Sequence, residues 1–227
     1  MNVEIKLSKK VFKPTGTSEE LFKSAVKQNK KPSKILDLGC GSGYVGLSIA
    51  KASQKKNKLY FSDVSKDAVK LTKINSKKNK IKSEIKAGSL FDPWIGYKFN
   101  IIVNDVSGIS QDLNKITPWY NKHITNFSGR DGTDLTIKFL KESPKFLEKN
   151  GFILFPLISL SNYKKVLNFA KKNFKFIKKL STKKWPLPKE MYKHKKKIDK
   201  LRKNKLIFIE EKFGLMIFKT DIYMAKK

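Results

Sequence analysis

A glycine-rich turn that directly follows a short apolar run constrains this chain more than any other stretch. The run from Lys34 to Leu38 reads as a buried parallel strand, and it stops at Gly39, where Gly-x-Gly-x-Gly leads into a helical pattern. Three glycines this close together remove the side chains from the turn, so backbone N–H groups and the start of the next helix can approach a ligand directly. The stretch therefore predicts an α/β fold with a ligand at this strand end.

Two classes of cofactor are held by turns of this kind, and Asp37 helps to separate them. The residues from Gly41 to Gly46 also satisfy the dinucleotide pattern G-x-G-x-x-G, which alone is weak evidence. A dinucleotide turn usually has an apolar residue at the position of Asp37, whereas a cofactor with a sulfonium and an ammonium group gives a carboxylate something to neutralise. A glycine turn without any ligand is the third interpretation.

The segment Asp37-Leu38-Gly39-Cys40-Gly41-Ser42-Gly43 resembles motif I of the class I S-adenosylmethionine-dependent methyltransferases. In that family the acidic residue precedes a glycine turn that cradles the methionine part of the cofactor. The resemblance implies that S-adenosylmethionine is bound by Asp37, Gly39, Gly41 and Gly43. It also implies a Rossmann-like α/β fold with a seven-stranded, mostly parallel sheet, an antiparallel C-terminal hairpin and helices on both faces.

The second expected strand, 58–64, ends with an acidic residue at an informative distance. Asp63 lies 20 residues beyond Gly43, where a carboxylate can reach the ribose hydroxyls of an adenosine-containing cofactor. Alternatively, Asp63 or Ser65 caps the helix that begins at Lys66, and both roles can coexist. We expect Asp63 to bind the cofactor.

After the third expected strand, 83–87, the chain reads Gly88-Ser89-Leu90-Phe91 where the family often has Gly-Asp-Leu-Phe. The resemblance places Ser89 and Leu90 beside the adenine ring. A serine hydroxyl can still accept a hydrogen bond from the adenine amine, although it lacks the charge of the aspartate that it replaces.

The fourth expected strand, 99–105, ends in Asn104-Asp105-Val106-Ser107, where the amino methyltransferases that the chain resembles carry Asn-Pro-Pro-Tyr. In that motif the Asn and a backbone carbonyl accept hydrogen bonds from the target –NH2, which aims the nitrogen lone pair at the methyl group. Asn104 is retained, whereas both prolines and the tyrosine are absent. We expect Asn104 and Asp105 to be catalytic, with Asp105 as a hydrogen-bond acceptor or general base. The alternative is that both only shape the strand end.

Three residues are candidates for the substrate side. Arg130 is one of only two arginines and lies in a Gly-x-Asp-Gly turn that resembles the same place in the glutamine and small-domain methyltransferases, so it suits a carboxylate or phosphate. Trp119 or Tyr120 replaces the missing stacking ring or fills the edge of the core. The nearby His123 is interpreted as a surface histidine.

The N-terminal part, residues 1–31, resembles a Pro-rich element that folds over the cofactor in small-domain amino methyltransferases. It contains Thr17, the third candidate for the substrate side, and Ser18, a candidate N-cap of the helix that follows. An ordinary capped helix explains the same residues. The separate helical domain of the release-factor glutamine methyltransferases is missing, which counts against the same protein substrate.

The charge is extreme, with a formal net charge of +32 over 227 residues, which are expected to form a single domain. Such a charge favours polyanionic partners, but lysine spread over nearly every expected surface also fits a lysine-biased coding sequence. The strongest concentration is a basic insertion at 183–205, in which lysines alternate with aromatic residues. It suits a substrate clamp or a solvated helix, and a hairpin of 206–210 with 215–224 is expected after it.

No apolar run approaches the length of a membrane span, no signal peptide is evident, and Cys40 is the only cysteine. We therefore expect a cytoplasmic protein without a membrane partner or a metal, in which Cys40 is a packed residue.

Taken together, the residues predict a methyltransferase that modifies a nitrogen on a protein or RNA substrate, possibly related to translation. Two other functions stay open: a lysine-rich RNA- or ribosome-binding module with a vestigial cofactor site, and a nicotinamide-dependent oxidoreductase.

Overall fold

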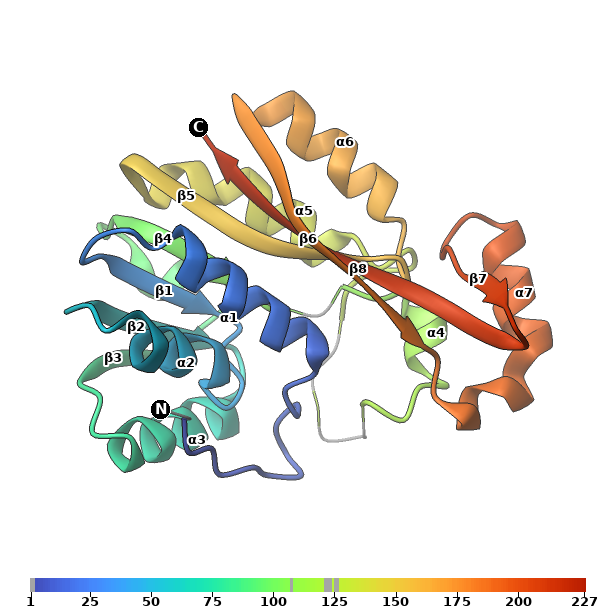
Figure 1. The fold of residues 1–227 in the computed structure, drawn as a ribbon, viewed down its shortest axis with the longest axis horizontal. Coiled ribbons are helices and arrows are strands. Elements are labelled where there is room, and N and C mark those ends of the chain that lie inside the picture. Colours follow the sequence, from blue (N-terminus) through green and yellow to red (C-terminus); the bar gives the residue numbers. More distant parts are fainter. Residues whose placement is uncertain (1–2, 107, 121–123, 125–126) are drawn as a thin grey trace.

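The computed structural model describes residues 3–106, 108–120, 124 and 127–227, and it is built on a single twisted sheet with helices on both faces (Figure 1). Among the described residues the sheet has eight strands in the order β3-β2-β1-β4-β5-β8-β6, with β7 paired to β8. The strands are β1 (Lys34–Leu38), β2 (Lys58–Asp63), β3 (Ser83–Ala87), β4 (Phe99–Asn104), β5 (Leu147–Ile158), β6 (Phe176–Pro186), β7 (Glu210–Lys212) and β8 (Leu215–Lys226).

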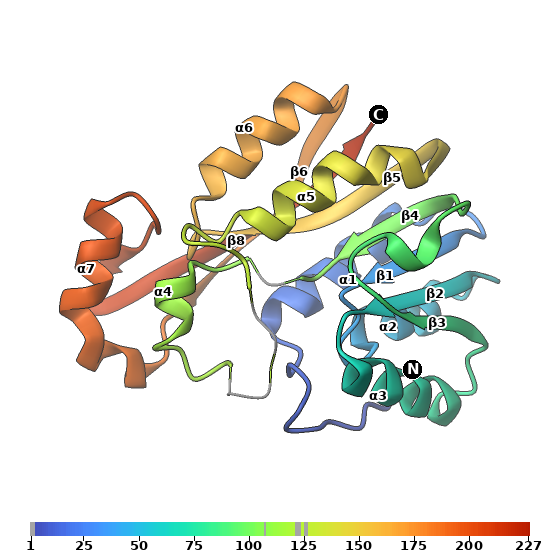
Figure 2. The same cartoon turned by 180° about the vertical axis from the view of Figure 1, so that it is seen from behind.

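Two apolar cores hold the helices against the sheet. The helices α1 (Gly16–Gln28) and α2 (Tyr44–Ser53) pack on one face, and α5 (Asp134–Glu142) and α6 (Tyr163–Asn173) pack on the other, which faces the viewer in Figure 2. The remaining helical segments are α3 (Lys66–Lys78), α4 (Gln111–Asn114), α7 (Lys195–Lys203), η1 (Asp92–Trp94), η2 (Ser143–Phe146) and η3 (Lys189–His194). None of these helices, as far as the chain is described, combines the length and apolar character that a bilayer crossing requires.

The parallel strands run through the middle of the protein, and their register brings their carboxyl ends together. β1 pairs with β2 on one side and β4 on the other, so that Leu38 lies beside both Ser62 and Asn104. Four of the five β1 residues are buried, as expected for a strand that is covered by helices on both faces. The turns that directly follow β1, β2 and β4 therefore lie together at the same edge of the sheet.

The C-terminal part of the sheet differs from the expectation. The chain was expected to form seven strands and to pair 206–210 with 215–224. The antiparallel C-terminal hairpin is confirmed, since β7 pairs with the start of β8, but β7 is only three residues long and starts at Glu210. In addition, β8 lies between β5 and β6, and β6 is a strand that was not expected. The sequence hides β6 because it is an exposed edge strand whose lysines interrupt the apolar alternation. The basic insertion expected at 183–205 consequently starts inside β6.

Helix α7 and η3 do not project into solvent. They pack with Ile207 and Ile209 before β7, the start of β8 and the segment around Ile109 in a third apolar cluster, in which Ile198 and Leu201 of α7 are buried. The interpretation of this stretch as a solvated helix over apolar stems is confirmed for α7.

Helix caps were only partly foreseen. Ser65 caps α3, accepting from the Ala68 N–H, as expected. The N-cap of α1 is Thr15 rather than Ser18, because the helix begins three residues earlier than expected. At the start of α6, Asn162 is the N-cap and its side chain accepts the hydrogen bond from the Lys165 N–H.

Gly46 is the position where α2 touches the sheet, and it gives a test of the fold. A Cβ there would overlap the Phe61 ring and lie 3.1 Å from Asp37 Cβ. We expect Gly46→Ala to lower the free energy of unfolding by about 1–3 kcal/mol through overpacking. Urea unfolding measures it.

The double variant Gly46→Ala with Phe61→Leu should lose less than the sum of the two single changes, because the smaller side chain makes room for the new methyl group. Additive losses would contradict this packing account.

Candidate active site

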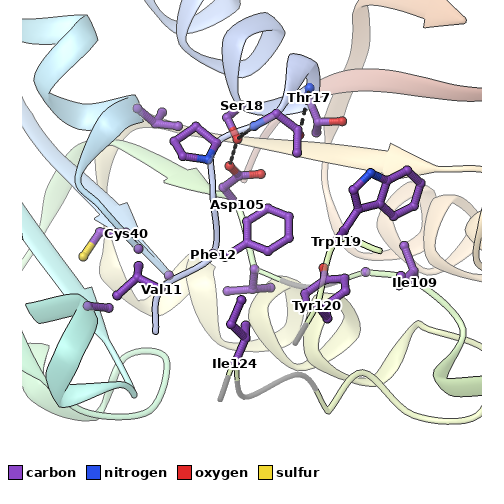
Figure 3. Close-up of a pocket in the computed structure, with 18 of the residues that line it drawn as sticks. Val11, Phe12, Thr17, Ser18, Cys40, Asp105, Ile109, Trp119, Tyr120 and Ile124 are labelled. Carbon is purple, nitrogen blue, oxygen red and sulfur yellow. Dashed lines mark hydrogen bonds between the residues drawn. The ribbon is translucent and has the colours of Figure 1, made fainter. Parts of the chain in front are cut away.

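A cavity of about 770 Å³ lies at the carboxyl ends of β1, β2 and β4 (Figure 3). The glycine turn and the ends of these strands form one wall. The N-terminal segment from Lys10 to Ser18 covers the cavity, and the far wall comes from Trp119 and from the ends of β6 and β8, including Trp185 and Phe218.

The glycine turn has the backbone that only glycine adopts without strain. Gly39, Gly41 and Gly43 have φ angles of +74°, +54° and +77°. A Cβ at Gly39 would lie 2.6 Å from Val106 Cγ1, so the turn touches the tip of β4. Gly39 and Gly41 line the cavity, whereas Gly43 lies behind them at the start of α2.

Asp37 is buried beneath the turn and has a free oxygen. Its Oδ2 accepts a 2.8 Å hydrogen bond from the Gly46 N–H, while its Oδ1 has no hydrogen-bond partner among the described residues. Burial raises the pKa of Asp37 to about 7; the Gly46 N–H opposes this rise, and the negative charges of Asp105 and Asp63 add to it. A buried carboxylate of this kind favours a cationic ligand, which would neutralise it.

Asp63 is tied to the same turn. Its Oδ2 accepts from the Gly41 N–H at 2.9 Å and its Oδ1 from the Ser65 N–H at 2.8 Å. Burial raises the pKa of Asp63, and the N–H groups of Ser65, Gly41 and Val64 oppose that shift. Ser65, not Asp63, caps α3, so the Asp63 carboxylate organises the turn and also faces the cavity, where its remaining lone pairs can accept from a ligand.

Ser89 and Leu90, expected at the adenine ring, line the cavity close to the end of β3. Leu90 has a φ of +43°, which a leucine rarely adopts. The structure thus brings Asp37, Gly39 and Asp63 into one lining with Ser89 and Leu90.

At the tip of β4 the two expected catalytic residues have different environments. Asn104 is 1% exposed and does not line the cavity directly; its Oδ1 has no partner among the described residues. Asp105 lines the cavity and its Oδ2 accepts a 2.6 Å hydrogen bond from the Ser18 hydroxyl. Burial raises the pKa of Asp105 to about 6, and the Ser18 hydrogen bond acts in the opposite direction. Ser107 of the same motif lies outside the described residues.

The substrate candidates separate in space. Thr17 and Trp119 line the cavity, but Arg130 is exposed and is not part of the lining. Trp119 packs edge to face on Phe218 with ring centroids 5.7 Å apart, and Tyr120 stacks on Phe12 at 4.9 Å. The two aromatic residues thus contribute to packing and to the cavity wall alike. His123 lies outside the described residues.

Cys40 is a packed residue. It is 7% exposed, its Sγ lies 3.4 Å from Thr72 Oγ1, and burial raises the pKa of its thiol well above the ordinary value. A thiol held neutral in this way is a poor nucleophile.

Sequence reasoning missed the cavity walls that come from distant segments. Trp185, Leu187 and Phe218 lie about 140 to 180 positions beyond the glycine turn in sequence and carry no cofactor motif, whereas Phe12 belongs to the N-terminal element that was expected to fold over the cofactor. It also missed the contact of Ser18 with Asp105, because the Ser18 hydroxyl was interpreted only as a helix cap.

The raised pKa of Asp37 predicts how the ligand-free protein responds to pH. Its folded-state pKa of about 7 lies above the ordinary 3.8, so the folded protein keeps a proton that the unfolded chain has released. The free energy of unfolding should therefore fall, by an amount on the order of a few kcal/mol, as pH rises from about 4 to about 7. Urea titrations across this range measure the slope.

Asp37→Asn should remove most of this dependence of the unfolding free energy on pH. A smaller dependence should remain, because the pKa of Asp105 is also raised, although by less. An undiminished slope in Asp37→Asn would show that Asp37 is not the titrating group.

Comparison with known proteins agrees with this geometry. The family model of the methyltransferase small domain matches residues 12–105, which include every expected cofactor residue. A protein named as a candidate N5-glutamine methyltransferase of Methanocaldococcus jannaschii is 30% identical over 170 residues, which cover 74% of this chain and 83% of that protein.

The release factor glutamine methyltransferase of Borreliella burgdorferi is 34% identical over 162 residues, which cover 68% of this chain and 55% of that enzyme. The chain thus spans about half the length of this relative.

Solved structures share the fold. The ribosomal protein L11 methylase of Lactobacillus delbrueckii subsp. bulgaricus has a TM-score of 0.58 at 14% identity, with 96% of this chain and 83% of that chain covered. The 16S rRNA N2 G1207 methyltransferase of T. thermophilus, solved with AdoMet and guanosine, has a TM-score of 0.57 at 14% identity, with 95% and 44% covered. At this identity the likeness concerns the fold alone.

The residues also fit the cofactor of that family. Gly39 and Gly41 leave the backbone of the turn open to the cavity, and Asp37 offers a buried oxygen, without a partner among the described residues, to a positive charge. S-adenosylmethionine is the cofactor, and methyl transfer is the reaction class. The chain belongs to the methyltransferase small-domain group of the class I S-adenosylmethionine-dependent methyltransferases.

Proposed function

We propose that the enzyme methylates the side-chain amide nitrogen of a glutamine in a protein of the translation apparatus. The observation that carries this proposal is the tip of β4, where the carboxylate of Asp105 lines the cavity and the preceding Asn104, which is paired with Leu38, keeps a buried Oδ1 without a partner among the described residues. An amide –NH2 has two N–H donors, and these two acceptors suit it. Relatives named as release factor and ribosomal protein uL3 glutamine methyltransferases support the same substrate class.

The chain's own groups are proposed to hold the cofactor in three places. Asp37 and the N–H groups of the turn at Gly39 and Gly41 face the methionine part, Asp63 faces the ribose, and Ser89 with Leu90 faces the adenine. When bound, S-adenosylmethionine supplies an electrophilic methyl group on a sulfonium. The ammonium group of the bound cofactor would compensate the buried negative charge of Asp37.

Asn104 and Asp105 are proposed to position the acceptor. Hydrogen bonds to both N–H groups orient the nitrogen lone pair, a contribution of geometry and electrostatics rather than of covalent chemistry. As the N–CH3 bond forms and the S–CH3 bond breaks, the nitrogen must release one proton, and the Asp105 carboxylate accepts it. A pKa of about 6 leaves Asp105 ionised at neutral pH and still basic enough for this role.

The N-terminal residues 1–31 are proposed to act as a lid in a single domain of residues 1–227. Val11, Phe12 and Pro14 form the cover of the cavity, and Thr17 and Trp119 line the side on which an acceptor would enter. The exposed Arg130 would then contact the body of the substrate outside the cavity. The basic insertion at 183–205 contributes Trp185 to the wall of the same chamber.

The ribose assignment is tested by Asp63→Asn. Loss of a charged acceptor should weaken S-adenosylhomocysteine binding about 10- to 100-fold in calorimetry, since hydrogen bonds to charged groups contribute about 1.5–3 kcal/mol. The control is Asp131→Asn, whose carboxylate bonds Thr133 and Lys165 outside the cavity lining and should leave affinity unchanged. Equal affinity in both variants would refute the ribose role.

The acceptor assignment is tested by transfer of labelled methyl groups into a cell extract and into a glutamine-containing release factor. We expect protease-sensitive label that acid hydrolysis releases as methylamine. Asn104→Ala should lower kcat by about 10²-fold or more while S-adenosylhomocysteine affinity stays within about threefold, because the proposed role of Asn104 concerns the acceptor and not the cofactor. Label that RNase removes would assign RNA as the substrate instead.

A further inference from the structure

Ser18 makes the shortest polar contact in the cavity that the proposed mechanism has not used. Its hydroxyl donates to Asp105 Oδ2 at 2.6 Å, and the two residues are 87 positions apart (Figure 3). Ser18 is 2% exposed, so no bulk water competes for its hydroxyl. A buried hydrogen bond to a carboxylate is stronger than one between neutral groups and favours the ionised form.

The Ser18 hydroxyl is fixed in direction by the start of α1. Ser18 is the third residue of the helix, and its Oγ accepts from the Thr15 N–H at 3.3 Å as part of a capping box. Because the oxygen accepts on one side, its hydrogen is polarised toward the other side, where Asp105 lies. The first turn of α1, with its free N–H groups and positive end of the helix dipole, adds to the field at this carboxylate.

The start of α1 is itself held in place from two sides. Thr17 Oγ1 lies 3.2 Å from Thr220 Oγ1 on β8, and the Trp185 ring packs so closely on Gly16 that a Cβ there would overlap it. The C-terminal strands therefore determine where the N-terminal helix points its third residue. The carboxylate after β4 is thus oriented by three segments that are remote in sequence.

The Asp105 side chain needs this support. It lies in the cavity wall near Asp37, with which it has an unfavourable charge interaction, and burial opposes its ionisation. The other titratable groups of the lining are Asp37, Cys40, Tyr44, Asp63, Tyr120, Lys10 and Lys189. Among the described residues, Ser18 is the group whose hydrogen bond favours the Asp105 anion.

We infer that Ser18 is a positioning residue for the methyl-acceptor site: its hydroxyl holds the Asp105 carboxylate ionised and turned toward the acceptor. The inference rests on the proposed role of Asp105 in methyl transfer. It adds a residue from the N-terminal cover to the acceptor machinery, so that the position of the start of α1 affects the strand tip.

The first experiment measures the Asp105 pKa directly in the cofactor-free protein. Side-chain carboxyl ¹³C shifts, assigned with Asp105→Asn, are followed by NMR as pH changes. Ser18→Ala should raise the Asp105 pKa by about one unit, because the anion loses its donor. The matched control is Thr15→Ala, which removes the hydroxyl half of the capping box yet keeps the backbone N–H of residue 15 and the Ser18 hydroxyl beside Asp105. It should leave that pKa nearly unchanged.

The second experiment measures methyl transfer as a function of pH. In Ser18→Ala the acidic limb of the kcat profile should move upward with the Asp105 pKa, so that kcat falls about fivefold near pH 6 and much less above pH 8. Thr15→Ala should not move the limb even if it lowers the melting temperature. A uniform loss of kcat at all pH values, or an equal movement in Thr15→Ala, would overturn the inference.

The two experiments separate this inference from the proposed function. If no glutamine is methylated, the proposed function fails, whereas the NMR titration still decides whether Ser18 controls Asp105. An Asp105 pKa that is the same with and without the Ser18 hydroxyl refutes the inference even in a fully active methyltransferase.

Discussion

The close approach of the turn after β1 to the tip of β4 is the constraint on which the rest of this structure depends. Leu38 and Asn104 are neighbours in the parallel register, and Gly39 leaves no space between the turn and Val106. A side chain at Gly39 would push the glycine turn away from the tip of β4, where Asn104 and Asp105 lie. Gly46, in the first turn of α2, likewise permits a close approach, because the helix there lies directly on Phe61 and on Asp37 of β1. Glycine is thus required here for proximity as well as for its backbone angles.

That proximity concentrates negative charge in a strongly basic protein. Asp37, Asp63 and Asp105 share one cavity lining, and the charges of the last two raise the pKa of Asp37. Each carboxylate receives hydrogen bonds from backbone or hydroxyl groups but is not fully compensated by them. The ligand-free site is therefore held in a state that costs stability, and a cationic ligand relieves it. Such strain at a functional site is a common trade between stability and activity.

The sequence predicted the parts of this arrangement that local chemistry determines. β1 and β3 have the expected bounds, and Ser65 caps α3. The two acidic residues at the carboxyl ends of β1 and β2, Asp37 and Asp63, line one cavity. The sequence did not predict the contacts between segments that are remote along the chain. Strand β6 was missed because lysines occupy its exposed edge, where apolar alternation carries no information. Likewise, Thr-Gly-Thr-Ser before a helix indicates a cap, yet nothing local shows that the Ser18 hydroxyl also meets Asp105.

The third apolar cluster explains why the basic insertion cannot be judged from its charge. Ile198 and Leu201 pack beneath the lysines of α7, and Leu187 of the same segment reaches both this cluster and the cavity. A lysine-rich surface over buried stems is what a chain with a formal net charge of +32 shows wherever a helix meets solvent. What distinguishes this segment is its packing. It shares the third apolar cluster with residues of β6 and β8, and Trp185 of β6 also packs on the start of α1. The start of α1, and with it Ser18, is therefore held by strands that pack on this cluster, so a change in the core of the cluster should alter the cavity at a distance from every motif.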